Sequence, residues 1–335
     1  MNKNLFLIAA ALALALPWAG CGKSDKLNKP SAFATPSGPV ELKLKWPPGE
    51  RIVQDMDMKQ SMELTVPGQP APIQEDMTLG QGFGMTVLKE NPDGGHEVEM
   101  EFLSARMGMT SGGATVLDYD SAKKPPADKA NSVADMFGKI VGSKIRFFLN
   151  ASSGVERMEG VEELVNRLSS GGPADQFATL KSMFSESYFK ELMSHYRILP
   201  PKPAQPGDTW PVQYEVPMAN MGILVMNYNV TLKGWETHEQ RNCARLEFQG
   251  TLKAKPDPAA KPADMSVSNL EGTTSGVSWF DPELGMTIGA SMTQDMTMVM
   301  KIPMNPNGTA GAAGETQSIT NQMRQDMTVK LVSVK

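Results

Sequence analysis

The sequence is poor in the residues that usually carry catalysis or bind metals. It has two cysteines, Cys21 and Cys243, and three histidines, His96, His195 and His238, each in a separate segment. Each of the three histidines lacks a recognisable partner, so no Ser/His/Asp arrangement can be nominated from the sequence. We therefore predict no catalytic residue, no metal site and no cofactor. The sequence does not decide whether the chain is an enzyme, but it favours a non-enzymatic role.

Excess positive charge and long apolar runs are also absent. The chain has 32 Lys and Arg against 37 Asp and Glu, a net charge of −5. Without a basic stripe, nucleic acid is not an expected partner. The apolar run at residues 5–16 is shorter than the roughly 20 residues that a membrane-spanning helix needs. No later stretch approaches that length, so we predict no spanning helix.

The N-terminus has the pattern of a secretory signal peptide over residues 1–20. A positive start at Lys3 precedes the apolar run, and small residues precede Cys21. A cysteine at this place resembles the lipobox of bacterial lipoproteins, in which the thiol takes diacylglycerol and becomes the first residue. Trp18 departs from that pattern, which prefers leucine. We predict lipidation of Cys21 and a lipid-anchored protein of the cell envelope that faces the periplasm or the exterior.

Residues 21–39 are rich in Lys, Ser, Pro and Asn, which predicts a flexible tether between the anchor and a folded body. Gly22 replaces the aspartate that retains some lipoproteins in the inner membrane, which favours the outer membrane where those sorting rules apply. The alternative is ordinary cleavage near Ala19 or Gly20, which gives a free secreted protein. With its only possible partner lipidated, Cys243 is expected as a buried thiol in a strand.

The body, residues 40–335, is predicted to be a single composite domain of the α+β class that is rich in strands. Alternating apolar and polar residues begin with a predicted strand at 40–46 and recur up to 322–334. Residues 131–199 interrupt this pattern, and apolar residues at helical spacing over 174–199 predict a helix that packs on a sheet. We expect curved antiparallel sheets, in the arrangement of a duplicated β unit, with this inserted helical segment packed on one face.

A short internal repeat supports the duplicated β unit. Gln-Asp-Met occurs at 54–56, 294–296 and 325–327, and Glu-Asp-Met at 75–77. Side chains of a strand alternate between its two faces, so a period of two places the methionines on one side of a sheet. Common strand composition is the alternative explanation of the repeat.

Methionine is abundant, with 25 residues, and several of them alternate along predicted strands. Three interpretations remain open: filler of an apolar core, lining of a cavity for an apolar ligand, and soft thioether ligands for Cu(I). Copper sites usually add histidine or cysteine, and neither flanks these methionines. The candidate ligand-binding residues are Met56, Met58, Met296, Met298 and Met300.

Three patches together resemble an uncharacterised family of bacterial envelope lipoproteins that is known only as a domain of unknown function. They are Trp-Pro-Pro-Gly-Glu-Arg at 46–51, Leu-Asp-Tyr-Asp-Ser at 117–121, and the proline-rich stretch at 199–203 with Pro-Gly-Asp-Thr-Trp at 206–210. The predicted hairpin at 143–160 adds to the resemblance. The resemblance implies an exported, β-rich body and brings no catalytic residue with it.

The sequence thus favours an envelope lipoprotein with a non-enzymatic binding or structural role. Its predicted partners are the membrane, through the lipid at Cys21, and either an apolar ligand or another envelope protein. One alternative is an envelope hydrolase whose site is assembled from distant residues. The other is a periplasmic Cu(I)-binding protein that uses the alternating methionines.

Overall fold

The computed structural model describes residues 33–123, 138–169, 189, 198–218, 222–255, 266–303 and 316–335. The predicted signal peptide, Cys21 and His195 lie outside the described residues, as does most of the predicted helix at 174–199. Of the predicted helical insertion at 131–199, the described part contains two strands, a helix at 161–169 and helical residues at 138–140.

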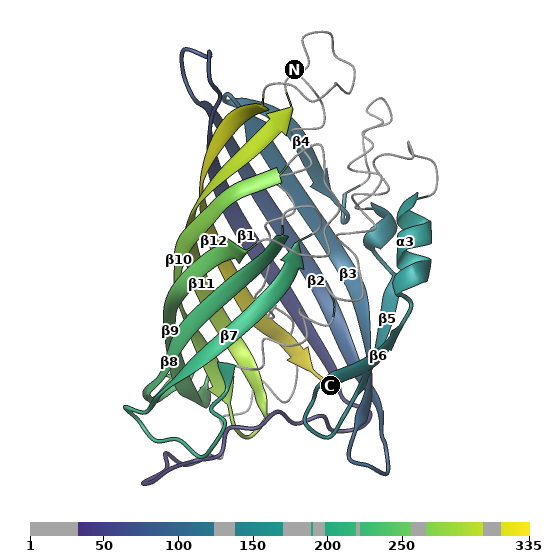
Figure 1. Cartoon of the computed structure of the whole chain (residues 1–335). Coiled ribbons are helices and arrows are strands. Elements are labelled where there is room, and N and C mark those ends of the chain that lie inside the picture. Colours follow the sequence, from purple (N-terminus) through teal and green to yellow (C-terminus); the bar gives the residue numbers. More distant parts are fainter. Residues whose placement is uncertain are drawn as a thin grey trace.

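Twelve strands form one antiparallel sheet, which twists and curves along its width (Figure 1). The one long helix in the described residues, α3 (Val161–Ser169), lies beside β5 and β6. The strands are β1 (Arg51–Thr65), β2 (Ile73–Glu90), β3 (His96–Ser111), β4 (Ala114–Asp120), β5 (Lys144–Leu149), β6 (Val155–Glu159), β7 (Thr209–Met218), β8 (Gly222–His238), β9 (Arg241–Lys255), β10 (Ser266–Asp281), β11 (Met286–Pro303) and β12 (Thr316–Val334).

The order across the sheet is β6-β5-β3-β2-β1-β12-β11-β10-β9-β8-β7, and β4 pairs with β3 off this path. Most neighbours are also neighbours in sequence, joined by turns such as Asn-Pro-Asp-Gly-Gly at 91–95 between β2 and β3. There are two exceptions. β3 pairs with β5, with β4 between them in sequence, and β1 pairs with β12, which joins the first and last strands at the centre of the sheet. The two halves of the chain therefore form one continuous sheet.

The predicted body rich in antiparallel strands is confirmed, because the described structure is mainly β. The sequence predicted more than one sheet, whereas the structure has a single sheet of twelve strands. The reason is that the alternating segments run as strands of up to 19 residues. Strands of this length pair along their whole extent, so that β1 and β12 share a continuous register from Gln54 to Thr65.

The predicted strand at 40–46 is not part of the sheet. Its residues are extended and their burial alternates, but their only bridge is an isolated one between Val40 and Ala204. An extended segment alternates its side chains whether or not it is paired, and here Leu42 and Trp46 pack into the core. We call residues 33–49 the strap, because they cross one end of the sheet.

The sheet has one buried face, which we call the inner face, and one polar outer face. On β1 the inner face carries the even-numbered residues, and on β2 the odd-numbered ones. The glycines of the Gly-Gln-Gly-Phe-Gly run at 80–84 lie on the outer face of β2. A Cβ at Gly80 would meet the guanidinium of Arg106 at 2.8 Å, and one at Gly84 would meet Arg51 at 2.7 Å. The glycines therefore make room for charged side chains from neighbouring strands, as close packing predicts.

Candidate functional site

A row of polar side chains crosses the inner face at the centre of the sheet. Gln60 of β1 is in register with Gln325 of β12, which is in register with Gln294 of β11. Gln294 is in turn in register with Thr274 of β10. Residues directly opposite in a ladder point to the same face, and adjacent strands lie about 4.8 Å apart. We call these four residues the amide row, and it extends over about 14 Å.

Methionines flank the amide row on both sides. Two residues along the strands in one direction, the register joins Met58, Met327 and Met292. In the other direction it joins Met62, Met323 and Met296. All six are buried. The inner face of the three central strands is therefore a polar band between two bands of thioethers.

Three members of the amide row are buried without a hydrogen-bond partner for at least one polar atom. Gln325 is 0% exposed, Gln294 is 2% exposed and Thr274 is 4% exposed. In the described structure, both amide atoms of Gln325, the Nε2 of Gln294 and the Oγ1 of Thr274 make no hydrogen bond. Nearly all buried polar groups in proteins are paired, and an unpaired one costs about 1–3 kcal/mol. This concentration of unpaired groups is the most unusual feature of the site.

The fourth member, Gln60, contacts the adjacent methionine band. Its Nε2 donates to the Sδ of Met62 at 3.0 Å. Glu75 of β2 lies in register with Met62 and is buried at the edge of the same band. Burial raises the pKa of the Glu75 carboxyl, and a hydrogen bond donated by Ser111 opposes that shift. Apart from Asp281 at the end of β10, which pairs with Arg241, Glu75 is the one buried ionisable side chain that the structure describes on β1, β2, β10, β11 and β12.

The five predicted ligand-binding methionines lie on this face but do not converge on one point. Met58 and Met296 belong to the two methionine bands. Met298 and Met300 continue along β11, and Met56 lies opposite Val329 on the other side of the row. Met298 and Met300 are buried, whereas Met56 is partly buried against the core. The amide row separates Met56 and Met58 from Met296, Met298 and Met300, so the five methionines do not surround a single point.

The amide row was missed by the sequence interpretation, although a signal for it was present. In the repeats at 54–56, 294–296 and 325–327, the glutamine precedes the methionine by two residues. The two side chains therefore share a face, and the intervening aspartate lies on the other. The structure bears this out, because Gln54, Gln294 and Gln325 are buried while Asp295 and Asp326 are exposed.

The described histidines and the free cysteine occupy structural positions. His238 stacks on Trp279 with ring centroids 4.1 Å apart, and burial lowers the pKa of its imidazole. Cys243 is fully buried, and burial raises the pKa of its thiol to about 12. A thiol with so high a pKa is a poor nucleophile at neutral pH. His96 is partly buried in β3.

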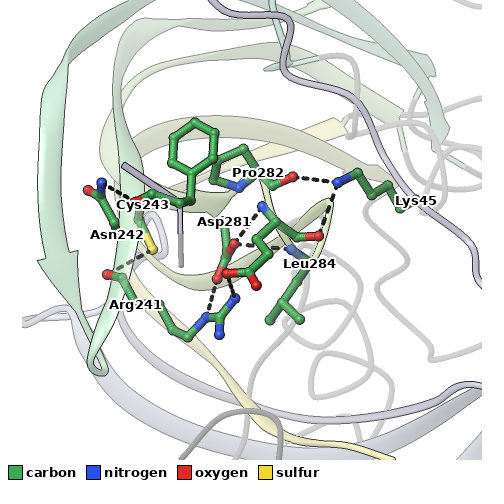
Figure 2. Close-up of polar contacts among 9 residues, drawn as sticks. Lys45, Arg241, Asn242, Cys243, Asp281, Pro282 and Leu284 are labelled. Carbon is green, nitrogen blue, oxygen red and sulfur yellow. Dashed lines mark hydrogen bonds and ion pairs between the residues drawn. The ribbon is translucent and has the colours of Figure 1, made fainter. Parts of the chain in front are cut away.

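The strap is fixed to one end of the sheet by a polar cluster (Figure 2). Lys45 donates to the carbonyls of Pro282 and Glu283, at 2.8 and 3.0 Å, in the turn between β10 and β11. Behind that turn Arg241 pairs with Asp281, and both side chains are buried. Asp281 also accepts from the backbone amides of Glu283 and Leu284. The cluster therefore joins β9, the β10–β11 turn and the strap.

Two further features of the described residues concern metals and membranes. No group of three or more His, Cys, Asp or Glu side chains there is arranged to hold a metal ion. Within the same described ranges, no helix is both long and apolar enough to cross a bilayer.

Comparison with protein families supports the predicted resemblance. Residues 93–287 match a family described as "Family of unknown function (DUF6263)". The match includes the patches at 117–121, 199–203 and 206–210 and the hairpin at 143–160. It does not reach the patch at 46–51. Among curated proteins, none matches the chain.

Solved structures show only distant similarity. A structure of lipid–protein interactions in lipovitellin aligns with a TM-score of 0.43 and 9% identity, over 87% of this chain and 26% of that chain. DynF from the dynemicin biosynthesis pathway of Micromonospora chersina has a TM-score of 0.19 and 8% identity, over 94% and 92%. A DUF1329 family protein from Desulfovibrio piger has a TM-score of 0.13 and 9% identity, over 84% and 85%. The chain spans about a quarter of the lipovitellin chain, and TM-scores this low do not establish a shared fold.

Proposed function

The chain belongs to DUF6263, a family of unknown function, and from its own residues we propose that it is an exported, lipid-anchored envelope protein that binds an apolar ligand on the inner face of its sheet. The signal-peptide pattern and Cys21 support export and anchoring. The binding role is non-enzymatic, and the membrane is the source from which the ligand comes.

The observation that carries this proposal is the composition of the inner face. Six methionines, in two bands of three, lie in register across β1, β12 and β11. Thioether side chains have several rotatable bonds and a polarisable sulfur, so they adapt to ligands of differing shape. A core that only has to be stable is better specified by branched side chains, which lose less freedom on packing. The methionine bands therefore favour a surface that accommodates a second molecule.

The test begins with the wild-type protein, expressed with its signal peptide and purified from membranes in a mild detergent. Native mass spectrometry and lipid extraction are expected to find about one apolar molecule bound per chain. In Met296→Trp, the larger ring is expected to occupy the ligand's space, so that the bound molecule is lost while the circular dichroism spectrum stays that of a folded sheet.

The matched control is Gln322→Trp, which puts the same ring on the exposed outer face of β12. This control is expected to keep the ligand. The proposal is wrong if the wild type carries no apolar molecule. It is also wrong if Met296→Trp unfolds the protein as overpacking of a solid core would. A Cu(I) titration of the ligand-free protein from the same preparations tests the copper alternative, which predicts that the chain binds Cu(I) in a fixed stoichiometry.

A further inference from the structure

We propose that the amide row recognises the uncharged polar group of a long-chain lipid, namely an amide or hydroxy-ester group that both donates and accepts hydrogen bonds. The inference rests on the proposed function and names the ligand class. Its basis is the set of polar atoms in Gln325, Gln294 and Thr274 that the described structure leaves without partners.

The number of unpaired atoms argues for a ligand at this place. Among the residues that the structure describes, Gln325 has neither a donor for its Oε1 nor an acceptor for its Nε2, although the side chain is fully buried. Leucine would fill a similar volume without leaving two unpaired groups, so glutamine lowers the stability of the ligand-free protein. Residues that lower stability without a compensating contact are found mostly at functional sites.

The kinds of atoms define what the ligand must offer. The Nε2 groups of Gln325 and Gln294 are donors and require an acceptor such as a carbonyl oxygen, whereas the Oε1 of Gln325 requires a donor. The Oγ1 of Thr274 serves either purpose. A primary or secondary amide meets both requirements, and so does an ester with a neighbouring hydroxyl group.

The surroundings exclude a charged group from the row. Apart from Asp281 at the end of β10, which pairs with Arg241, Glu75 is the one ionisable side chain buried on these described strands, and it lies beside the methionine band and not in the row. The four members of the row carry no charge, so an ammonium or carboxylate of the ligand would be buried there without an opposite charge beside it, at a cost of several kcal/mol. A charged headgroup, if the ligand has one, must lie away from the row.

The methionine bands are apolar and would contact the apolar part of the same ligand. They lie two residues from the row on either side, or about 6.6 Å along the strands. Beyond them the inner face continues as an apolar stripe to Met298 and Met300 on β11. A ligand with its polar group at the row can therefore extend an acyl chain along the strands.

The test compares two probes of equal chain length, hexadecanamide and hexadecane, each transferred from cyclodextrin to delipidated protein. In the double variant Gln294→Leu/Gln325→Leu, the ratio of Kd for the amide to Kd for the hydrocarbon is expected to rise about tenfold over wild type. That change corresponds to about 1.4 kcal/mol, which fits the net value of one or two hydrogen bonds. For hexadecanoate and hexadecylamine, the ratio of Kd to that of hexadecane is expected to be the same in wild type and in the double variant.

Gln322→Leu is the matched control, because it makes the same substitution on β12 but on the exposed outer face. It is expected to leave the ratio unchanged. The single variant Gln325→Leu, whose melting temperature is expected to equal or exceed that of wild type, shows that folding is intact. If wild type binds both probes and the double variant keeps the same ratio, the assignment of the row is wrong while ligand binding stands. If wild type binds neither probe, the proposed function itself fails.

Discussion

At the scale of single residues, Glu75 is the carboxylate whose protonation is tied to the inner face. It lies in register with Met62 on one side and Ser111 on the other, and the Oγ of Ser111 donates to its Oε1 at 3.3 Å. Burial disfavours the charged form and raises the pKa of this carboxyl above its ordinary value. A group at this position couples the stability of the sheet to pH.

The sign of that coupling follows from proton uptake. The folded protein holds the Glu75 proton more tightly than the unfolded chain, so the free energy of unfolding falls as pH rises from about 4.3, the ordinary pKa of glutamate. Glu75→Gln removes this effect. The variant is expected to be more stable than wild type at pH 7, and the difference is expected to vanish near pH 4, as followed by thermal melts across that range.

The exposed Glu271→Gln on β10 is the control for the Glu75 experiment. Its melting temperature is expected to follow that of wild type at every pH. A Glu75→Gln protein that gains stability equally at pH 4 and pH 7 would contradict the role given to burial, because the gain would then not come from protonation.

At the scale of elements, the buried ion pair of Arg241 and Asp281 holds the end of β9 to the β10–β11 turn. Asp281 is 0% exposed and Arg241 is 3% exposed. Glu283 provides a second, partly exposed partner to Arg241 at 2.8 Å. Removing one charge of a buried pair leaves the other without compensation.

Asp281→Asn is therefore expected to lower the free energy of unfolding by about 3 kcal/mol. Asparagine keeps an oxygen for the backbone amides of Glu283 and Leu284, so the loss reports on charge rather than on the turn. Urea denaturation followed by tryptophan fluorescence measures the change. In the exposed pair of Arg324 and Asp295, Asp295→Asn is expected to cost less than about 1 kcal/mol. Equal losses in the two variants would refute the importance of burial.

Strands and turns were largely predictable because their signals are local. The alternation of β1 and β12 and the Asn-Pro-Asp-Gly-Gly turn can each be read from consecutive residues. The structure has both strands and has that turn between β2 and β3. The pairing of β1 with β12 is not local, since nothing near Met58 specifies Met327 as its neighbour. The amide row depends on that pairing, so its residues were visible in the sequence but their alignment was not. The strap was wrongly predicted as a strand of the sheet. Alternation predicts that a segment is extended, but it does not predict whether the segment pairs with a neighbour.

At the scale of the whole molecule, the strap determines which end of the sheet carries the N-terminal segment. The side chain of Asn242 donates to the carbonyl of Phe33 at 3.0 Å, and the ring of Phe33 lies 5.2 Å from that of Trp235. Trp46 donates to Ser153 at 3.0 Å, in the turn between β5 and β6. The strap therefore connects the β8–β9 end with the β5–β6 turn, close to both edges of the sheet (Figure 1).

This arrangement limits how far one end of the body lies from the membrane if Cys21 carries the proposed lipid. From residue 21 to residue 33 there are 12 residue steps, which span at most about 42 Å even when fully extended. The other end of the sheet is farther by the length of a strand, and the 18 residues of β11 correspond to about 60 Å. The strap end is thus held within about 42 Å of the lipid, whereas the far end can lie about 100 Å away when the strands stand upright on the bilayer.

Energy transfer from a protein-bound dye to acceptors in the bilayer measures this difference. Thr237→Cys, near the strap end, is expected to give clear transfer in reconstituted vesicles, whereas Gln69→Cys, in the turn between β1 and β2 at the far end, is expected to give much less. The buried thiol of Cys243, with its pKa raised to about 12, should not compete for the dye. Cys21→Ala is expected to abolish both signals. Equal transfer from the two positions would mean that the body lies flat on the membrane, and stronger transfer from residue 69 would mean that the strap does not set its orientation.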